Sequence, residues 1–354
     1  MWYIIITFFV SVVALLGYKK DWVGLFITGF LLFLLMFRGD NVGHDTKAYL
    51  DPHFLYIRTE AAFDVNSNNM QIDTYDYTLE LISNKLYEVV FYNNLSPRIV
   101  LYFYAIITIV FLYFAFKRFR VNIALGMMFF VLLGLFFFSM TASRQMAAVS
   151  VVAFGMSFIL DDSIKKYLFF LFILIASLIH ASAIFFIWLY LLRFVKVKRN
   201  PIIIASAIIC FVFTILPIDI MAIVYGISNV QYISRYAGQF DSTEKHILGS
   251  IIGLLSFVFY FSWLQNNNKK YKTDFYEDLY LIGLLSMALF SSHSILLIRV
   301  TYYVTIFICV FLSKELEKQP YKRLDGLLWM FLILRIYMAK DWLPMLESDY
   351  YLMF

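Results

Sequence analysis

The sequence predicts an all-α polytopic membrane protein. Its 354 residues are 62% hydrophobic and only 15% charged, and the mean hydropathy is +0.77, whereas a soluble domain normally carries about a quarter charged residues. Apolar runs alternate with basic clusters along the whole chain, and a run of about 17 to 25 residues is needed for a transmembrane helix. These observations exclude an ordinary soluble domain and predict a single transmembrane domain over residues 1–354.

About ten transmembrane helices are expected, several of them near the short limit. They begin near Trp2, Trp22, Arg98, Val121, Ser143, Pro201, Leu248, Phe275, Leu297 and Leu324. The first run lacks a basic leader and a small-residue cleavage site, so we expect a retained helix rather than a signal peptide. Six basic clusters lie between the runs and hold most of the 29 Lys and Arg residues. The positive-inside rule places all six on the cytoplasmic side.

The apolar interval 167–192 interrupts this simple alternation. Basic clusters flank it at both ends, so it must enter and leave the membrane on the same side if every cluster is cytoplasmic. We therefore predict a re-entrant helical hairpin of two segments, each about 13 residues and roughly 20 Å long. Its tip is expected at residues 177–183 and includes His180. The alternative is one long tilted span with a weaker charge bias.

This topology leaves two long loops on the outer side, at residues 38–97 and 218–247. Within residues 76–93 apolar residues recur at helical spacing, which predicts an amphipathic helix lying in the membrane interface. The second loop combines several tyrosines with Arg235. That combination suits stacking on sugar rings, although interface anchoring explains most aromatic residues in such a chain.

Four arginines lie at the outer ends of predicted spans, where the positive-inside rule disfavours them: Arg38, Arg98, Arg144 and Arg299. Arginine suits bidentate phosphate binding, so a converging group would form a diphosphate site. Arg144 is the strongest candidate because it begins a helix whose unpaired backbone N–H groups also favour an anion. The alternative for each arginine is a headgroup contact or an ion pair, which is the preferred interpretation for Arg98.

His180 and Asp45 are the candidate bases. A neutral imidazole at a hairpin tip could accept a proton from a sugar hydroxyl, although a lone His in an apolar segment is more often structural. Asp45 could act as the base, orient an arginine, or cap a helix running toward Tyr49. The sequence contains no metal-binding constellation, G-x-S-x-G elbow or P-loop, so a metal centre, a hydrolase and an ATP-driven pump have no support.

The candidate residues fall within short motifs. These are Arg38 with Val42-Gly-His-Asp45 and Tyr49; Arg144-Gln145 with Ala147; Lys165-Lys166-Tyr167 leading to Ala176-Ser-Leu-Ile-His180-Ala-Ser-Ala183; and Arg299 with Tyr302 and Tyr303. In this order they resemble the EpsG/Wzy-type polysaccharide repeat-unit polymerases of bacterial envelopes. His44 departs from the pattern, since the resemblance leads us to expect Thr at that position.

The resemblance implies a GT-C-like polymerase/ligase architecture. It further implies a glycosyltransferase in the bacterial cytoplasmic (inner) membrane, with its active site facing outward. Such an enzyme would join undecaprenyl-diphosphate-linked oligosaccharide repeat units into O-antigen, capsule or exopolysaccharide. Its expected partners are the lipid-linked donor and acceptor, membrane lipid and an optional chain-length regulator, with no nucleic acid, cofactor or metal ion.

The expected roles in that reaction fall into three groups. Arg144, Arg299 and Arg38 would hold the donor diphosphate, and His180 or Asp45 would deprotonate or orient the acceptor hydroxyl. The expected glycan contacts are Arg235, Tyr232, Tyr236, His44 and Gln145. Two other classes stay open as alternatives, a lipid-linked glycan transporter (flippase) and a membrane O-acyltransferase. The arginines at outer span ends argue against a transporter, because alternating access needs polar groups that are reachable from both sides.

Overall fold

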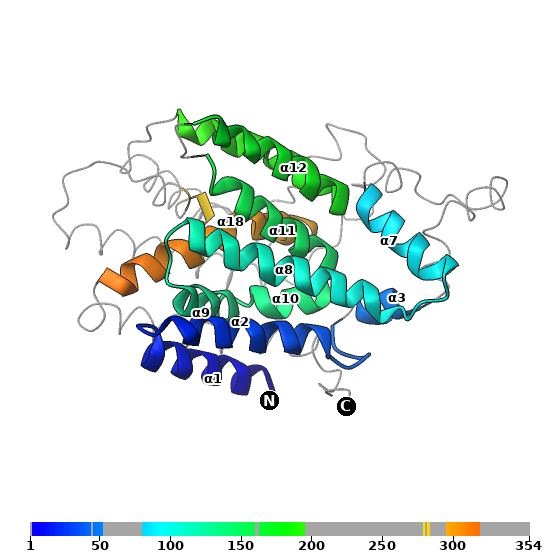
Figure 1. The fold of residues 1–354 in the computed structure, drawn as a ribbon, viewed down its shortest axis with the longest axis horizontal. Coiled ribbons are helices and arrows are strands. Elements are labelled where there is room, and N and C mark those ends of the chain that lie inside the picture. The colour runs from blue at the N-terminus through cyan, green and yellow to red at the C-terminus, as the bar shows by residue number, and fades with distance from the viewer. Residues whose placement is uncertain are drawn as a thin grey trace, which may run out of the picture. The chain divides into compact units, whose positions relative to one another are not determined.

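The computed structural model describes residues 2–43, 45–51, 80–159, 163–194, 279, 282–283 and 295–318. The chain forms two compact units, Met1–Tyr190 with Leu312–Phe354, and Leu191–Phe311. Every regular element in the described ranges is a helix (Figure 1), which confirms the all-α class for this part of the chain. Helix α18 (Ile295–Lys318) carries most of the described residues of the second unit.

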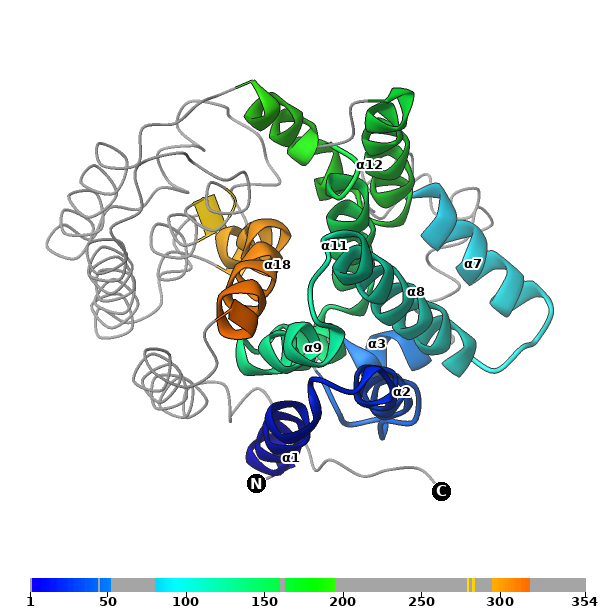
Figure 2. The ribbon, with the colours of Figure 1, turned by 60° about the vertical axis from the view of Figure 1, so that its left-hand side comes forward.

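The first unit is built around α8 (Arg98–Arg118) and α11 (Ser143–Met156), which pack extensively against each other. Both views show this pair between α2 (Asp21–Met36) and α12 (Leu168–Ile179) (Figures 1 and 2). The buried residues of α11 include several small ones, among them Ala147, Ala148, Ser150, Ala153 and Gly155. Small side chains let helices approach closely, so α11 can contact α8 and α12 at once.

Four predicted span starts coincide with helix starts. Helices α1 (Trp2–Gly17), α8 and α11 begin at the predicted residue, and α2 begins one residue before Trp22. By length and composition, α8 is the one helix of the described ranges that could cross a membrane unaided. Helices α1 and α2 are apolar but only 16 residues long. The full set of about ten spans therefore stays a prediction, and the spans from Pro201, Leu248 and Leu324 lie outside the described residues.

The span predicted from Val121 is broken into two helices. Helix α9 (Ile123–Leu132) and helix α10 (Leu135–Thr141) together are apolar enough for one crossing, but they meet at an angle of 63°. Gly134 lies at the break with a φ of +75°, a conformation that glycine adopts without steric cost. The sequence does not predict this bend, because a single glycine in an apolar run does not by itself indicate a break.

The chain reverses direction at His180. Helix α12 ends at Ile179, His180 is extended (φ −148°, ψ 117°), and the 3-10 helix η2 (Ala181–Arg193) follows. The ring of Phe169, at the start of α12, stacks on Tyr190 near the end of η2 with centroids 5.9 Å apart. Two residues 21 positions apart can meet in this way only if the two segments run back along each other. Whether this hairpin is re-entrant in a membrane stays a prediction.

The geometry of η2 explains which of its side chains are buried. Ala183, Phe186 and Leu189 are buried, at intervals of three residues, and a 3-10 helix has three residues per turn. The residues between them include Phe185 and Trp188, which are exposed at 72% and 42%. The hairpin therefore presents one apolar stripe to the protein and leaves large apolar side chains on its outer surface.

Helix α7 (Leu81–Tyr92) forms within the segment where an interfacial helix is predicted. Its inward face is mainly polar, because Ser83, Asn84 and Tyr87 are buried there together with Val90, while Leu81 and Val89 are about half exposed. A helix at a membrane interface places its apolar face toward the acyl chains, which leaves the polar face for the protein. The described face pattern is consistent with that placement.

Gly43 and Thr46, the latter at the start of α3 (Thr46–Leu50), pack on the junction of α10 and α11. Thr46 is fully buried, and its hydroxyl donates a hydrogen bond to the Met140 carbonyl oxygen (3.3 Å). Gly43 has a φ of +85°, and a methyl group added there would collide with the same Met140 carbonyl. The loop therefore needs glycine at position 43 for both its conformation and its close approach.

We predict that Gly43→Ala lowers the melting temperature of the detergent-solubilised protein. The expected cost is about 1 to 3 kcal/mol, since a left-handed conformation and a backbone collision must both be accommodated. Gly29→Ala is the matched control, because no described atom lies within 4 Å of a methyl group added there and alanine favours the interior of a helix. Equal melting temperatures for the two variants would contradict the described loop.

Candidate active site

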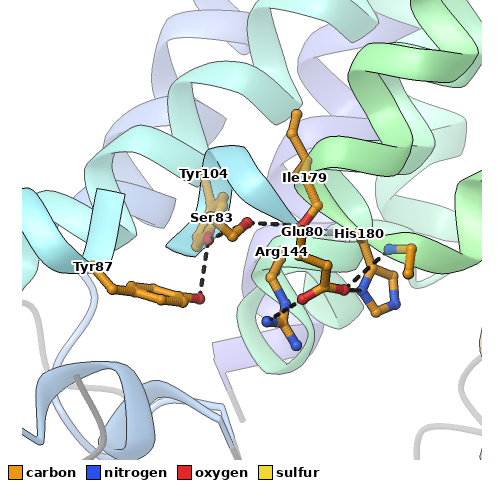
Figure 3. A network of polar contacts seen from close by, with 8 residues as sticks. Glu80, Ser83, Tyr87, Tyr104, Arg144, Ile179 and His180 are labelled. Carbon is orange, nitrogen blue, oxygen red and sulfur yellow. Dashed lines mark hydrogen bonds and ion pairs between the residues drawn. The ribbon is translucent and has the colours of Figure 1, made fainter. Parts of the chain in front are cut away.

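A buried carboxylate joins the two residues that the sequence marks most strongly. Glu80 Oε2 lies 2.6 Å from Arg144 Nη1, and Glu80 Oε1 lies 2.6 Å from His180 Nδ1 (Figure 3). The side chain of Glu80 is 1% exposed, compared with 15% for Arg144 and 24% for His180. The arrangement is an Arg–Glu–His cluster with its carboxylate inside the protein and its two partners partly accessible.

Hydrogen bonds between α7 and α12 hold Glu80 in this position. Ser83, in the first turn of α7, donates to the carbonyl oxygen of Ile179 at the last turn of α12 (2.7 Å). The extended conformation of His180 leaves the backbone N–H of Ala181 without a helical acceptor, and it donates to Glu80 Oε1 (3.0 Å). The chain reversal at His180 therefore creates a donor for the carboxylate as well as presenting the imidazole.

A buried layer of hydroxyl groups supports the cluster from α8. The Tyr104 hydroxyl lies 2.8 Å from Ser83 Oγ and 3.0 Å from the Tyr87 hydroxyl (Figure 3). Both tyrosines are 0% exposed. Since buried polar groups are costly unless they are hydrogen-bonded, this chain of contacts fixes α7 relative to α8.

The carboxyl of Glu80 is ionised over the whole physiological pH range. Burial raises the pKa of this group, but the Arg144 guanidinium and the contacts with His180 and Ala181 lower it from 4.5 to about 2. A buried ionised carboxylate is stable only when charges and donors compensate it. Glu80 is therefore an acceptor-only group at neutral pH.

Arg144 and Arg38 differ in how fully the protein uses their donors. The guanidinium of Arg144 makes one ion pair, with Glu80, and its buried Nη1 meets no acceptor with hydrogen-bond geometry in the described residues. In contrast, Arg38 is 1% exposed and donates to the Leu35 carbonyl (3.1 Å), the Thr46 hydroxyl (3.1 Å) and the Ser143 hydroxyl (2.8 Å). The Arg144 side chain is 15% exposed and can meet a ligand, whereas Arg38 joins the loop to the start of α11.

Arg38 and Arg144 nevertheless lie in the same part of the fold. Arg38 bonds to Ser143, the residue before Arg144, although 105 positions separate the two bonded residues. Tyr49 also lies near Arg144, and its ring packs on Tyr104 with centroids 5.9 Å apart. Arg38 and Tyr49 thus both lie near the start of α11, and a diphosphate role for Arg38 stays a prediction.

The other predicted site residues are placed only in part. Asp45 precedes α3 and makes no side-chain capping bond, and Gln145 is buried on α11. Arg299 lies on α18, but its side chain is outside the described residues. His44, Tyr232, Arg235 and Tyr236 are also outside the described residues. The roles predicted for all of these residues stay predictions.

Arg98 has the local ion pair expected for it. Its guanidinium pairs with Asp40 and donates to the carbonyl oxygen of Arg38 (3.2 Å). Arg98 therefore stabilises the exit from α2, and nothing assigns it to the cluster around Glu80. In the described part of the chain, no group of three His, Cys, Asp or Glu residues is arranged to hold a metal ion.

Glu80 is the site residue that sequence reasoning missed. Charged residues are expected on the polar face of an interfacial helix, so this carboxylate did not stand out. The signal that could have found it is a polar stripe at helical spacing, formed by Glu80, Ser83, Asn84 and Tyr87. Such a stripe beside a strongly apolar helix face indicates that the polar face packs on the protein.

A sequence model described as the EpsG family matches residues 21–353 of this chain. No curated protein and no solved structure matches the chain.

We predict that part of the stability of this protein is lost in acid because of Glu80. A group whose folded-state pKa is lower than its ordinary value stabilises the fold above pH 4.5, and this contribution disappears as the pH falls toward 2. A shift of this size corresponds to roughly 3 kcal/mol. Glu80→Gln should lower the melting temperature at pH 7 and should flatten its decline between pH 6 and pH 3.

Glu88→Gln is the control for this measurement. It removes a carboxylate from the same helix, where Glu88 pairs with the exposed Lys85 (2.6 Å), and surface pairs contribute about 1 kcal/mol at most. Its acid dependence should follow that of the wild type. An unchanged slope in Glu80→Gln would show that the buried carboxylate is not the titrating group.

Proposed function

The chain belongs to the EpsG family, and on that premise we propose that it polymerises lipid-linked oligosaccharide repeat units. Membership of this family indicates a membrane protein of polysaccharide biosynthesis with polymerase-like activity. The proposed donor is a glycan on undecaprenyl diphosphate, and the proposed acceptor is a hydroxyl group of a second lipid-linked unit. The product would be O-antigen, capsule or exopolysaccharide, formed on the outer face of the cytoplasmic membrane.

The observation that carries this proposal is the pairing of Arg144 and His180 on one buried carboxylate. Both contacts with Glu80 are 2.6 Å, so a guanidinium cation and an imidazole contact the two oxygens of the same carboxylate. Transfer of a glycan from a diphosphate needs both kinds of group, a cation for the leaving diphosphate and a base for the attacking hydroxyl. These contacts bring together Arg144 from α11 and His180 from the hairpin tip.

Arg144 is proposed to hold the donor diphosphate. As the bond between the anomeric carbon and the phosphate oxygen breaks, its electron pair stays on the diphosphate, and a nearby guanidinium stabilises the added charge. Two observations support this role, namely the partial exposure of the Arg144 side chain (15%) and its place in the first turn of α11. Backbone N–H groups at a helix start attract anions for the same electrostatic reason.

His180 is proposed to accept the proton of the acceptor hydroxyl. The O–H bond breaks, the new glycosidic C–O bond forms at the anomeric carbon, and the imidazole carries the proton until it is passed to the leaving diphosphate or to water. The side chain is 24% exposed, which leaves it accessible to a substrate. Asp45 remains the second candidate for this role.

The remaining predicted residues complete the proposal. Arg38 and Arg299 are proposed to support diphosphate binding, and Arg235, Tyr232, Tyr236, His44 and Gln145 are proposed to contact the glycan. The reaction as proposed needs no metal ion and no nucleotide sugar, because arginines would balance the charge of the diphosphate. A lipid-linked glycan transporter and a membrane O-acyltransferase are the competing functions.

We predict that Arg144→Ala abolishes polymer in cells while single repeat units continue to be displayed. The rate of chain extension should fall by roughly a hundredfold or more, since removal of one charge-stabilising donor commonly costs that much. Arg144→Lys should retain part of the activity, because it keeps the charge but loses the planar fork of donors. The measurement is gel separation of glycan chains, in cells and with the purified protein supplied with lipid-linked repeat units.

Arg120→Ala is the matched control, because Arg120 is exposed just beyond the end of α8. The same substitution there should leave chain length unchanged. Normal chain length in Arg144→Ala would refute the assignment of the diphosphate site. Acetylated glycans of unchanged length would instead favour an acyltransferase, and movement of lipid-linked units across vesicles without extension would favour a transporter.

A further inference from the structure

The contact between Glu80 and His180 specifies more than proximity, because it decides which ring nitrogen of His180 carries the proton. Histidine has two ring nitrogens, and in the neutral form one is a donor and the other an acceptor. Glu80 Oε1 lies 2.6 Å from Nδ1. The carboxylate can only accept, so the proton of the neutral imidazole must be on Nδ1.

We propose that Glu80 is a positioning residue that holds His180 in the Nδ1–H tautomer, so that Nε2 is free to take the proton of the acceptor hydroxyl. The inference rests on the proposed function for the identity of that hydroxyl. The tautomer itself depends only on the described contacts. Glu80 touches neither the donor nor the acceptor in this proposal, and it acts through His180.

Three contacts fix the orientation of the carboxylate. Ala181 N–H donates to the same oxygen that accepts from His180, and Arg144 pairs with the other oxygen. Each Glu80 oxygen therefore has a different partner, and rotation of the carboxylate would separate one of them from its charge. This arrangement leaves the imidazole little freedom to turn Nδ1 away from Glu80.

The second ring nitrogen lies on the side of the imidazole away from the buried carboxylate. Glu80 is 1% exposed and His180 is 24% exposed, so the ring edge that faces Glu80 is inside the protein. Figure 3 shows the second ring nitrogen on the edge turned away from Glu80. A substrate hydroxyl that reaches this edge would meet an unprotonated Nε2.

The same carboxylate also stabilises His180 after proton transfer. When Nε2 accepts the hydroxyl proton, the ring becomes a cation next to an ionised Glu80, and an opposite charge at hydrogen-bond distance stabilises it. Glutamine at position 80 would lack this charge. Its amide could also turn its NH₂ group toward Nδ1, which would place the ring proton on Nε2 and block acceptance of a proton there.

The test uses nitrogen-15 NMR of the full-length protein in detergent micelles, with ring-labelled histidine. The protein has five histidines, and the His180 signals are identified by their absence from His180→Asn. The proposal expects a protonated Nδ1 and an unprotonated Nε2 in the wild type above neutral pH. Glu80→Asp should keep this tautomer, and Glu80→Gln should lose it. A wild-type His180 protonated on Nε2 would overturn the proposal without the need for any Glu80 variant.

Activity measurements with lipid-linked repeat units separate this proposal from the proposed function. Glu80→Gln should lower kcat by roughly a hundredfold or more, with partial activity in Glu80→Asp, and Glu88→Gln should match the wild type. If the wild type shows the Nδ1–H tautomer and Glu80→Gln loses it, but the wild type forms no polymer, the positioning role stands and the polymerase proposal fails. If the wild type forms polymer and Glu80→Gln keeps both the tautomer and the full kcat, the positioning proposal fails.

Discussion

The first unit depends on the need to compensate one buried negative charge. Glu80 is ionised and almost completely buried, and an ionised carboxylate in that position is destabilising unless cations and donors surround it. Its compensating groups come from α11, from the tip of the hairpin and from the backbone of η2. The carboxylate therefore fixes three segments relative to each other, and breaking a buried pair of this kind typically costs about 3 to 5 kcal/mol.

This constraint explains why the polar face of α7 points inward. Glu80 precedes the helix, and Ser83 and Tyr87 continue the same face toward Ile179 and Tyr104. Leu81 and Val89 lie on the outer face, where a membrane interface would accept them. In water such a helix would turn its apolar side to the protein, so the packing of α7 is consistent with a lipid environment for this family of membrane proteins.

Arg38 and Arg144 lie in the same region, but their different surroundings suit one to a structural role and the other to ligand binding. Arg38 has hydrogen-bonded partners on three of its nitrogen atoms and is closed off from solvent. Arg144 balances one carboxylate and is partly exposed. A residue that binds a ligand needs unused donors in an accessible position. A structural residue needs its donors hydrogen-bonded inside the protein. The proximity of Arg38 to Ser143 lets the structural arginine support the start of the helix that presents Arg144.

Local properties of the sequence determined the all-α class, four of the described helix starts, the break at His180 and the importance of Arg144 and His180. Apolar length, charge clusters and helix-start chemistry all act over a few neighbouring residues. The tertiary structure decided the rest, including the break at Gly134 and the inward face of α7. It also decided that Glu80 is the common partner, because 100 positions separate it from His180. Tertiary packing alone determines which distant carboxylate is buried beside two donors, because the local sequence does not specify how far a side chain is buried on folding.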